Sequence, residues 1–369
     1  MPRSQKSRWI TFLVTVILPL FAIHAQTDKD RAQVEAQKAI DYMNRNQAEA
    51  ALAAWDKALA LDPKNIPFQY ERVIAIAMTK NYKRAIELLE PIYRDTSLLD
   101  RGYQLMGNCY DLLDDSSRSL PYYREGLKAY PKSGRLHYEL GAAAFIDGNR
   151  KEAVDYWLKG TQVEPAFATN YYWLCKAHVD RPDKIWAVLY GEIFLMAERS
   201  TYRTREISKL LFDTWNSALA IGDSTDPINL CSDALLNQPN PRDASAMNFP
   251  TAFEYNVAVS AQYLSAPGQG RIPRLSIAQL VSLRARFIRS WVKAGYLEKY
   301  PNDLLQWQNT VLEGGWINEY FWWLYSWGDK QEMNDYFVRN EQRYDTFLAW
   351  FGARAVDFSK PICVGLGCP

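Results

Sequence analysis

The chain has 369 residues, with 43 basic and 42 acidic side chains, three His and five Cys. Its hydrophobic content of 48% and charged content of 23% are typical of a folded protein, which excludes wholesale disorder. A net charge of +1 lacks the basic excess of a general nucleic-acid binder, so we expect no nucleic acid among its partners. With only three His, few side chains are available to act as an imidazole base or as a His metal ligand.

The N-terminus predicts export. Residues 1–8 carry three basic side chains and no acid, an apolar run covers 9–23, and the small residue Ala25 follows. This order is typical of a secretory signal, so we predict a signal peptide over residues 1–25. An uncleaved anchor is the alternative, but the run has about 15 residues and a bilayer needs about 18–20. No other segment is as apolar, so we expect an exported chain, periplasmic or otherwise extracytoplasmic, that is soluble after cleavage.

An internal repeat of 34 residues follows. Small residues recur at this spacing at Ala51, Ala85, Ser119, Ala153 and Ala187. Four residues after each of them stand the mostly large Trp55, Leu89, Tyr123, Trp157 and Gly191, and twelve before stand the mostly small Ala39, Val73, Gly107, Gly141 and Cys175. Helical apolar spacing and short polar turns, such as residues 147–149, predict a pair of antiparallel helices in each unit. Small residues let the two helices approach, and a large one fills the hole opposite.

These markers resemble the tetratricopeptide repeat family. The units run over 32–65, 66–99, 100–133, 134–167 and 168–201. Pro63, Pro131 and Pro165 end the first, third and fourth, the second lacks this Pro, and the fifth is degenerate. The resemblance implies an all-α superhelical solenoid of about five helix pairs, with a concave face that binds peptides and with no catalysis. A solenoid end needs a cap, and we predict a capping helix over 202–221.

The repeat register also predicts which residues line the concave face. From the first helix of each pair these are Tyr70, Ile74, Arg101, Gln104, Asn108, Arg135, Tyr138, Tyr172 and Lys176. Tyr offers a large contact area at low entropy cost, and Arg can grip a carboxylate with two hydrogen bonds. We therefore expect an extended, partly acidic segment of a partner protein as the ligand. In the alternative interpretation these residues are solvated or pack against the C-terminal region.

The second half of the chain is predicted to be an irregular connection over 222–247 and a helical region over 248–369, with helices near 250–265, 274–297, 302–313 and 329–350.

Arg286, Arg289 and Lys293 recur at +3 and +7 in a stretch without acids, so they share one helix face. This face predicts a docking site for an anionic partner, such as an acidic protein or an envelope polymer. Alternatively, it pairs with acids of the last helix, including Asp329, Glu332, Asp335 and Glu341.

Aromatic residues make up 14% of the chain and are dense between Trp316 and Trp350. The intervening rings are Tyr320, Phe321, Trp322, Trp323, Tyr325, Trp327, Tyr336, Phe337, Tyr344 and Phe347. They cover every face of a helix, so some of them can be exposed and stack on sugars, which predicts glycan binding as an alternative function. The other interpretation is that these rings fill the core.

Catalysis and cofactors find little support. His137 and His178 fall on first helices of repeats, neither at metal-ligand spacing from a Cys or a second His. Residues 202–369 contain no His, which excludes a Ser-His-Asp or Cys-His site within that half. A hydrolase with two distant carboxylates is the remaining enzymatic alternative. We predict a non-enzymatic chain without metal or cofactor, acting as a protein–protein interaction scaffold of the bacterial cell envelope.

The five Cys give a further prediction. Cys109 and Cys175 occupy helical repeat positions, where free buried thiols are expected. Cys363 and Cys368 can close a small disulfide loop in an oxidising compartment, with Cys231 as a possible competitor for the pairing.

Overall fold

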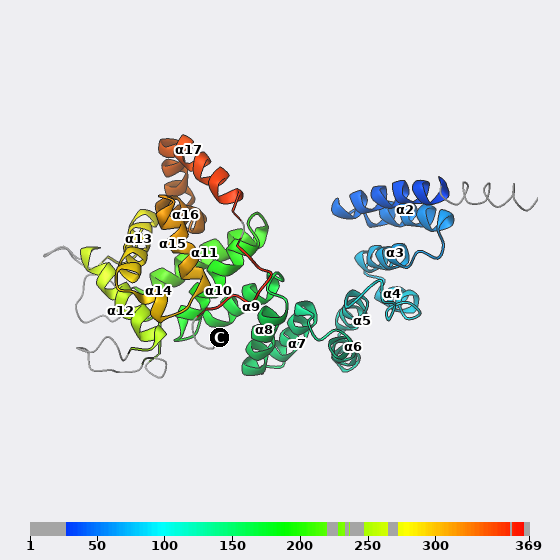
Figure 1. Cartoon of the computed structure of the whole chain (residues 1–369). Helices are drawn as coiled ribbons and strands as arrows, with labels where there is room; N and C mark the ends of the chain where they lie inside the picture. Colours follow the sequence, from blue (N-terminus) through cyan, green and yellow to red (C-terminus); the bar gives the residue numbers. More distant parts are fainter. Residues whose placement is uncertain are drawn as a thin grey trace, which may run out of the picture. The chain divides into compact units, whose positions relative to one another are not determined.

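The computed structural model describes residues 27–219, 228–232, 236, 247–264, 272–354 and 356–364 (Figure 1). The predicted signal peptide and most of the predicted connection over 222–247 lie outside these residues. Within them the chain consists of helices, turns and connecting segments, with an isolated bridge between Asn302 and Val364, so the predicted all-α fold is confirmed. The chain divides into two compact units, residues 1–131 and 132–369.

The first unit contains three consecutive helix pairs. A helix over 27–44 pairs with α2, and the other helices follow in order: α2 Ala48–Leu61, α3 Ile66–Met78, α4 Tyr82–Leu89, α5 Arg101–Asp111 and α6 Ser116–Ala129. Helix α4 is short because Pro91 follows it, and Pro cannot continue the hydrogen-bond ladder. The predicted units 32–65, 66–99 and 100–133 therefore each hold a helix pair.

The second unit begins with two more pairs and a longer helix: α7 Gly134–Ile146, α8 Arg150–Val163, α9 Thr169–His178, α10 Lys184–Ala197 and α11 Tyr202–Ala218. Polar caps begin several of these helices. Ser133 Oγ accepts the Leu136 N–H at 3.0 Å, which satisfies one of the orphan donors in the first turn of α7. The degenerate fifth repeat is a true helix pair, α9 and α10.

Beyond α11 the chain adds α12 Phe249–Ala261, α13 Ile277–Lys293, the short α14 Tyr296–Lys299, α15 Asp303–Glu313, α16 Ile317–Leu324 and α17 Lys330–Gly352. Helices are thus present near all four predicted positions. Helix α16 was not predicted, because its run of aromatic side chains has no clear helical periodicity. It is almost wholly buried and packs against α13.

Small residues of first helices face large residues of second helices, as the repeat markers predict. A Cβ added to Gly141 would lie 2.3 Å from Nε1 of Trp157, and one added to Gly107 would lie 2.2 Å from the Tyr123 ring. Real Cβ atoms do not come so close to other atoms, so only Gly allows this approach of the two helices. In the fifth pair Cys175 and Gly191 take the two positions, and the Cys175 thiol is fully buried.

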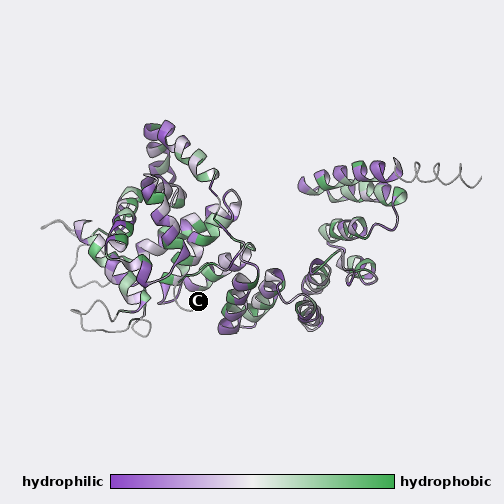
Figure 2. Ribbon diagram, viewed as in Figure 1, coloured by the Kyte–Doolittle hydropathy of each residue, from purple (hydrophilic) through white to green (hydrophobic). Residues whose placement is uncertain are grey.

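One hydrophobic core runs through the second unit. It joins Trp157 of α8, Phe194 of α10 and Trp215 of α11 to Trp291 of α13 and Phe351 of α17. Figure 2 shows hydrophobic residues along one part of most helices and hydrophilic residues along the rest. Helix α11, predicted as a capping helix, carries residues of this shared core, and through it the repeats pack against the C-terminal helices.

A buried ion pair lies inside this core. Arg284 of α13 is fully buried and its Nη2 lies 2.9 Å from a Glu192 carboxylate oxygen of α10. Gln308 of α15 donates to the same carboxylate at 2.6 Å. The Arg284 guanidinium also lies 4.8 Å from the centre of the Trp215 ring. These contacts connect the last repeat to the C-terminal helices.

Candidate functional site

In the first unit, Tyr70 and Arg101 of the predicted concave face connect neighbouring repeats. Tyr70 is buried, and its hydroxyl donates to the Arg101 carbonyl at 3.3 Å. The Arg101 guanidinium lies 5.2 Å from the centre of the Tyr70 ring. Asn108 accepts a hydrogen bond from the Tyr123 hydroxyl at 2.7 Å. Ile74 and Gln104 are half-buried on the same first helices.

In the second unit, three polar groups meet between α9 and α11. Glu206 accepts hydrogen bonds from the Tyr172 hydroxyl at 2.8 Å and from Lys176 Nζ at 2.7 Å. Lys176 also donates to the Tyr172 hydroxyl at 3.1 Å. Burial alone would raise the pKa of Glu206, but the bonds from Lys176 and Tyr172 prevail and lower it. Tyr172 and Lys176 are thus held in place by α11.

Aromatic rings continue this surface toward α7. Tyr138 is half-buried and its ring stacks on that of Trp173 at 6.4 Å between centroids. Trp173 stacks in turn on Trp157 at 5.6 Å. The Arg135 guanidinium lies 5.4 Å from the centre of the Phe167 ring. The surface of α7, α9 and α11 therefore combines rings with two cations and one acid, all held by neighbours.

Sequence reasoning missed Glu206 and Trp173. Glu206 could have been found, because it continues the 34-residue register of Tyr70, Gln104, Tyr138 and Tyr172 by one more unit. Arg203 likewise continues the register of Arg101 and Arg135, and its guanidinium donates to Thr169 at 3.2 Å. Helix α11 therefore serves as a further first helix of the array. No pattern in the sequence indicated Trp173.

The basic face of α13 does not form, within the described residues, the ion pairs with acids of the last helix that the alternative interpretation predicted. Arg286, Arg289 and Lys293 are exposed, and within the described ranges none of them makes an ion pair. Of the acids expected to pair with them, Glu332 instead accepts the N–H groups of Ile277 and Ala278 at 2.7 and 2.9 Å. The Arg286 guanidinium lies 4.0 Å from the centre of the Tyr263 ring. This face remains open to an anionic partner.

The aromatic cluster between Trp316 and Trp350 is core. Six of its rings are buried, at Tyr320, Phe321, Trp322, Tyr325, Tyr344 and Phe347, and the other six are half-buried. None is exposed, so the exposed rings on which glycan binding was predicted to depend are not present here. The rings pack on one another, as Trp322 and Tyr336 do at 4.0 Å between centroids.

The remaining titratable candidates are structural. Cys109, Cys175 and Cys231 are free and buried, which removes Cys231 as a competitor. Cys363 is described but Cys368 lies outside the described residues, so their disulfide stays a prediction. His137 Nδ1 lies 2.8 Å from the Ser133 carbonyl oxygen. The part of the chain described holds no group of three or more His, Cys, Asp or Glu suited to a metal ion.

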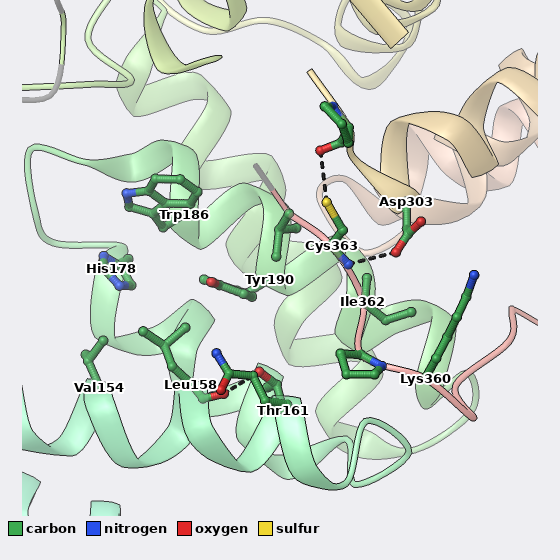
Figure 3. Close-up of a pocket in the computed structure, with 14 residues that line it drawn as sticks. Val154, Leu158, Thr161, His178, Trp186, Tyr190, Asp303, Lys360, Ile362 and Cys363 are labelled. Atoms are coloured by element: carbon green, nitrogen blue, oxygen red, sulfur yellow. Dashed lines mark hydrogen bonds between the residues drawn. The ribbon is translucent and has the colours of Figure 1, made fainter. Parts of the chain in front are cut away.

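The second unit also contains a hollow of about 890 Å³ (Figure 3). Its walls are the second helices α8 and α10, the end of α9 at His178, the start of α15 at Asp303, and residues 360–364. No sequence pattern predicts this hollow, because it depends on residues 360–364 lying against the second helices α8 and α10.

With this geometry established, the chain can be compared with known proteins. Residues 37–97 and 113–169 match the family described as tetratricopeptide repeat. These segments are tetratricopeptide repeats. The observed helix pairs and the small–large packing agree with that assignment, which confirms the resemblance seen in the sequence.

Other similarities are partial. Over 121 residues the chain is 26% identical to the general transcriptional corepressor ssn6 of Schizosaccharomyces pombe, matching 32% of this chain and 11% of that protein. Among solved structures, MamA of Desulfovibrio magneticus RS-1 is 19% identical with a TM-score of 0.35, covering 47% of this chain and 98% of that one. YrrB, described as a TPR protein with an unusual peptide-binding site, is 19% identical with a TM-score of 0.31. The match covers 46% of this chain and 87% of that one. In the described residues no helix is both long and apolar enough to cross a membrane.

Proposed function

We propose that the chain is a non-catalytic interaction scaffold of the bacterial cell envelope, whose tetratricopeptide repeats bind an extended segment of a partner protein. The observation that carries this proposal is the surface of the half-buried Tyr138 and Lys176 in the second unit, with the buried Tyr172 beneath it. These side chains combine ring area with hydrogen-bonding groups and are held by contacts to Trp173 and Glu206. A surface ordered before binding loses less side-chain entropy when a partner arrives.

The charge of this surface indicates what the partner carries. In the first unit Arg101 has a 40% exposed side chain, and its Nη1 lies 3.8 Å from the Glu71 carboxylate. In the second unit Lys176 is 34% exposed and shares Glu206 with Tyr172. Each cation therefore retains exposed donors while one acid orients it. Acidic side chains spaced along an extended segment fit such donors.

Site-specific photo-crosslinking tests this proposal. A photoreactive amino acid is placed at Tyr138 or at Gln104, both half-buried on first helices, and the protein is exposed to extracts of the cells that produce it. A matched control carries the same group at Ile146, which is 82% exposed at the end of α7. We expect one discrete adduct from the first two positions and none from Ile146. Equal labelling at all three positions, or none at any, would overturn the proposed site.

The envelope location rests on the predicted signal peptide. N-terminal sequencing of the protein recovered from its native cells tests it directly. We expect the mature chain to begin at Gln26 and to fractionate away from the cytoplasm. A chain that retains residues 1–25 and stays in the cytoplasm would remove the envelope from the proposal while leaving the scaffold function intact.

A further inference from the structure

The hollow in the second unit is a slot between two helices. Val154 and Leu158 stand one turn apart on α8, and Trp186 and Tyr190 stand one turn apart on α10. Residues at this spacing share a helix face, so the two pairs give the hollow elongated apolar walls. Figure 3 shows Trp186 and His178 at one end of the hollow, Lys360 and Ile362 at the other, and Tyr190 and Leu158 between them.

The remaining wall is a segment of fixed backbone. Residues 356–364, the C-terminal strap, leave α17 and cross to the start of α15. Asp303 holds the strap at Cys363: its carboxylate accepts the Cys363 N–H at 2.7 Å, and its own N–H donates to the Cys363 carbonyl at 2.9 Å. Phe358 packs its ring on that of Tyr171 at 6.3 Å between centroids. The strap, held by these contacts, forms one side of the slot.

Among the described residues that line the hollow, the cation is Lys360, and it lies at one end. Lys360 is exposed at the mouth and makes no ion pair within the described ranges. The nearby Asp357 carboxylate accepts the Ser359 N–H at 2.9 Å, and the Lys360 charge acts on it without forming an ion pair in the described residues. At the opposite end, His178 Nδ1 is buried without a hydrogen-bond partner in the described structure. The acid in the lining, Asp303, is engaged by the strap.

We propose that this slot binds a single-chain anionic amphiphile, of which a fatty acid is the simplest example. The apolar walls contact the alkyl chain of the ligand, because burying each methylene group removes apolar surface from water. The unpaired Lys360 takes the head group, which stays at the solvent-exposed mouth and avoids the cost of burying a charge. Of the polar residues in the lining, Thr161 donates to the Leu158 carbonyl and Gln162 accepts from Lys159, so they leave few free partners for a sugar or a nucleotide. This site lies on second helices and is separate from the proposed partner-binding face.

Calorimetric titration of the mature protein with decanoate and with decanol distinguishes the contribution of the ligand's alkyl chain from that of its charged head group. We expect saturable 1:1 binding of decanoate, with a dissociation constant on the order of 10–100 μM. Lys360→Glu should raise the dissociation constant of decanoate about five- to tenfold and leave that of decanol unchanged. The matched control Lys132→Glu reverses an exposed lysine that does not line the hollow, and it should affect neither ligand.

Filling the slot gives the second arm of the test. Leu158→Trp should abolish binding of both ligands, with Val154→Phe as a smaller substitution if the first variant does not fold. A diazirine-bearing fatty acid should label peptides of α8, α10 or the strap without any substitution. The proposal is overturned if decanoate does not bind saturably, if Lys360→Glu weakens both ligands equally, or if the label falls elsewhere.

Discussion

At the scale of single residues, His178 makes stability depend on pH. Burial, with the Arg181 charge acting in the same direction, lowers the pKa of His178 from 6.5 to about 4. Between these values the unfolded chain binds a proton that the folded chain does not bind. The free energy of unfolding therefore falls as the pH drops from about 6.5 toward 4, by roughly 2 kcal/mol at pH 5.

Urea unfolding of the wild type and of His178→Phe at pH 7.5 and pH 5 measures this effect. The variant should lose less stability than the wild type over the same interval, because its side chain does not titrate. His137, whose pKa burial also lowers, remains in both proteins and contributes equally to both. Identical pH dependence in the two proteins would contradict the role given to His178.

The buried pair of Arg284 and Glu192 is the second prediction at this scale. Arg284→Met leaves Glu192 buried with Gln308 as its remaining partner, so we expect a loss of about 3–5 kcal/mol in the free energy of unfolding. Replacing both residues, as Arg284→Met with Glu192→Leu, should recover most of that loss because no charge is left in the core. Chemical denaturation followed by circular dichroism measures both. A double variant as unstable as the single one would show that packing, and not the unpaired charge, dominates.

At the scale of elements, the fit of Gly141 against Trp157 holds α7 and α8 together. Gly141→Leu places a side chain where Trp157 Nε1 already lies 2.3 Å from the Cβ position, so we expect overpacking to cost about 1–3 kcal/mol or more. The adjacent, half-buried Ala142 provides the control, since Ala142→Leu adds similar volume on another face. In thermal unfolding, the midpoint temperature should fall clearly for Gly141→Leu and change little for Ala142→Leu. Equal effects would mean that the small–large contact is not specific.

The open basic face of α13 predicts charge-dependent binding. Reversing Arg286, Arg289 and Lys293 to Glu should weaken binding to poly-L-glutamate about tenfold or more, because each exposed charge pair contributes a few tenths to 1 kcal/mol. Reversing the exposed Lys83, Arg124 and Lys128 of the first unit gives the same net charge and is the control. Elution from an immobilised polymer in a salt gradient measures the difference. If both triple variants elute alike, total charge and not this face determines the binding.

Helix pairs and their register could be read from the sequence because each small–large contact joins positions within one unit. The concave-face residues could be placed on helices for the same reason. What they touch could not be predicted, since Tyr172 and Lys176 depend on Glu206 one unit further on. Burial of the C-terminal rings was undecided because a helix such as α16 carries rings on every face, and only long-range packing decides which face is covered.

At the scale of the whole molecule, the hydrophobic core of the second unit does not end where the 34-residue register ends. The second compact unit covers residues 132–369 and unites the last two helix pairs with α11 to α17. Its core contains Phe194 and Trp215 from the repeat side and Phe253, Trp291 and Phe351 from the C-terminal side. The predicted junction, with repeats over 32–201, a capping helix over 202–221 and a helical region from 248, therefore lies within a continuous core.

This organisation predicts which fragments fold. A fragment of residues 132–369 keeps the whole core and should unfold cooperatively as a soluble protein. A fragment of residues 26–221 loses the partners of Phe194 and Trp215 and leaves Glu192 without Arg284, so it should expose apolar surface and aggregate or bind a hydrophobic dye. Circular dichroism, size-exclusion chromatography and limited proteolysis compare the two. If the 26–221 fragment is monomeric and resists proteolysis through α10 and α11, the repeats do not need the C-terminal helices, and the shared core is dispensable for their folding.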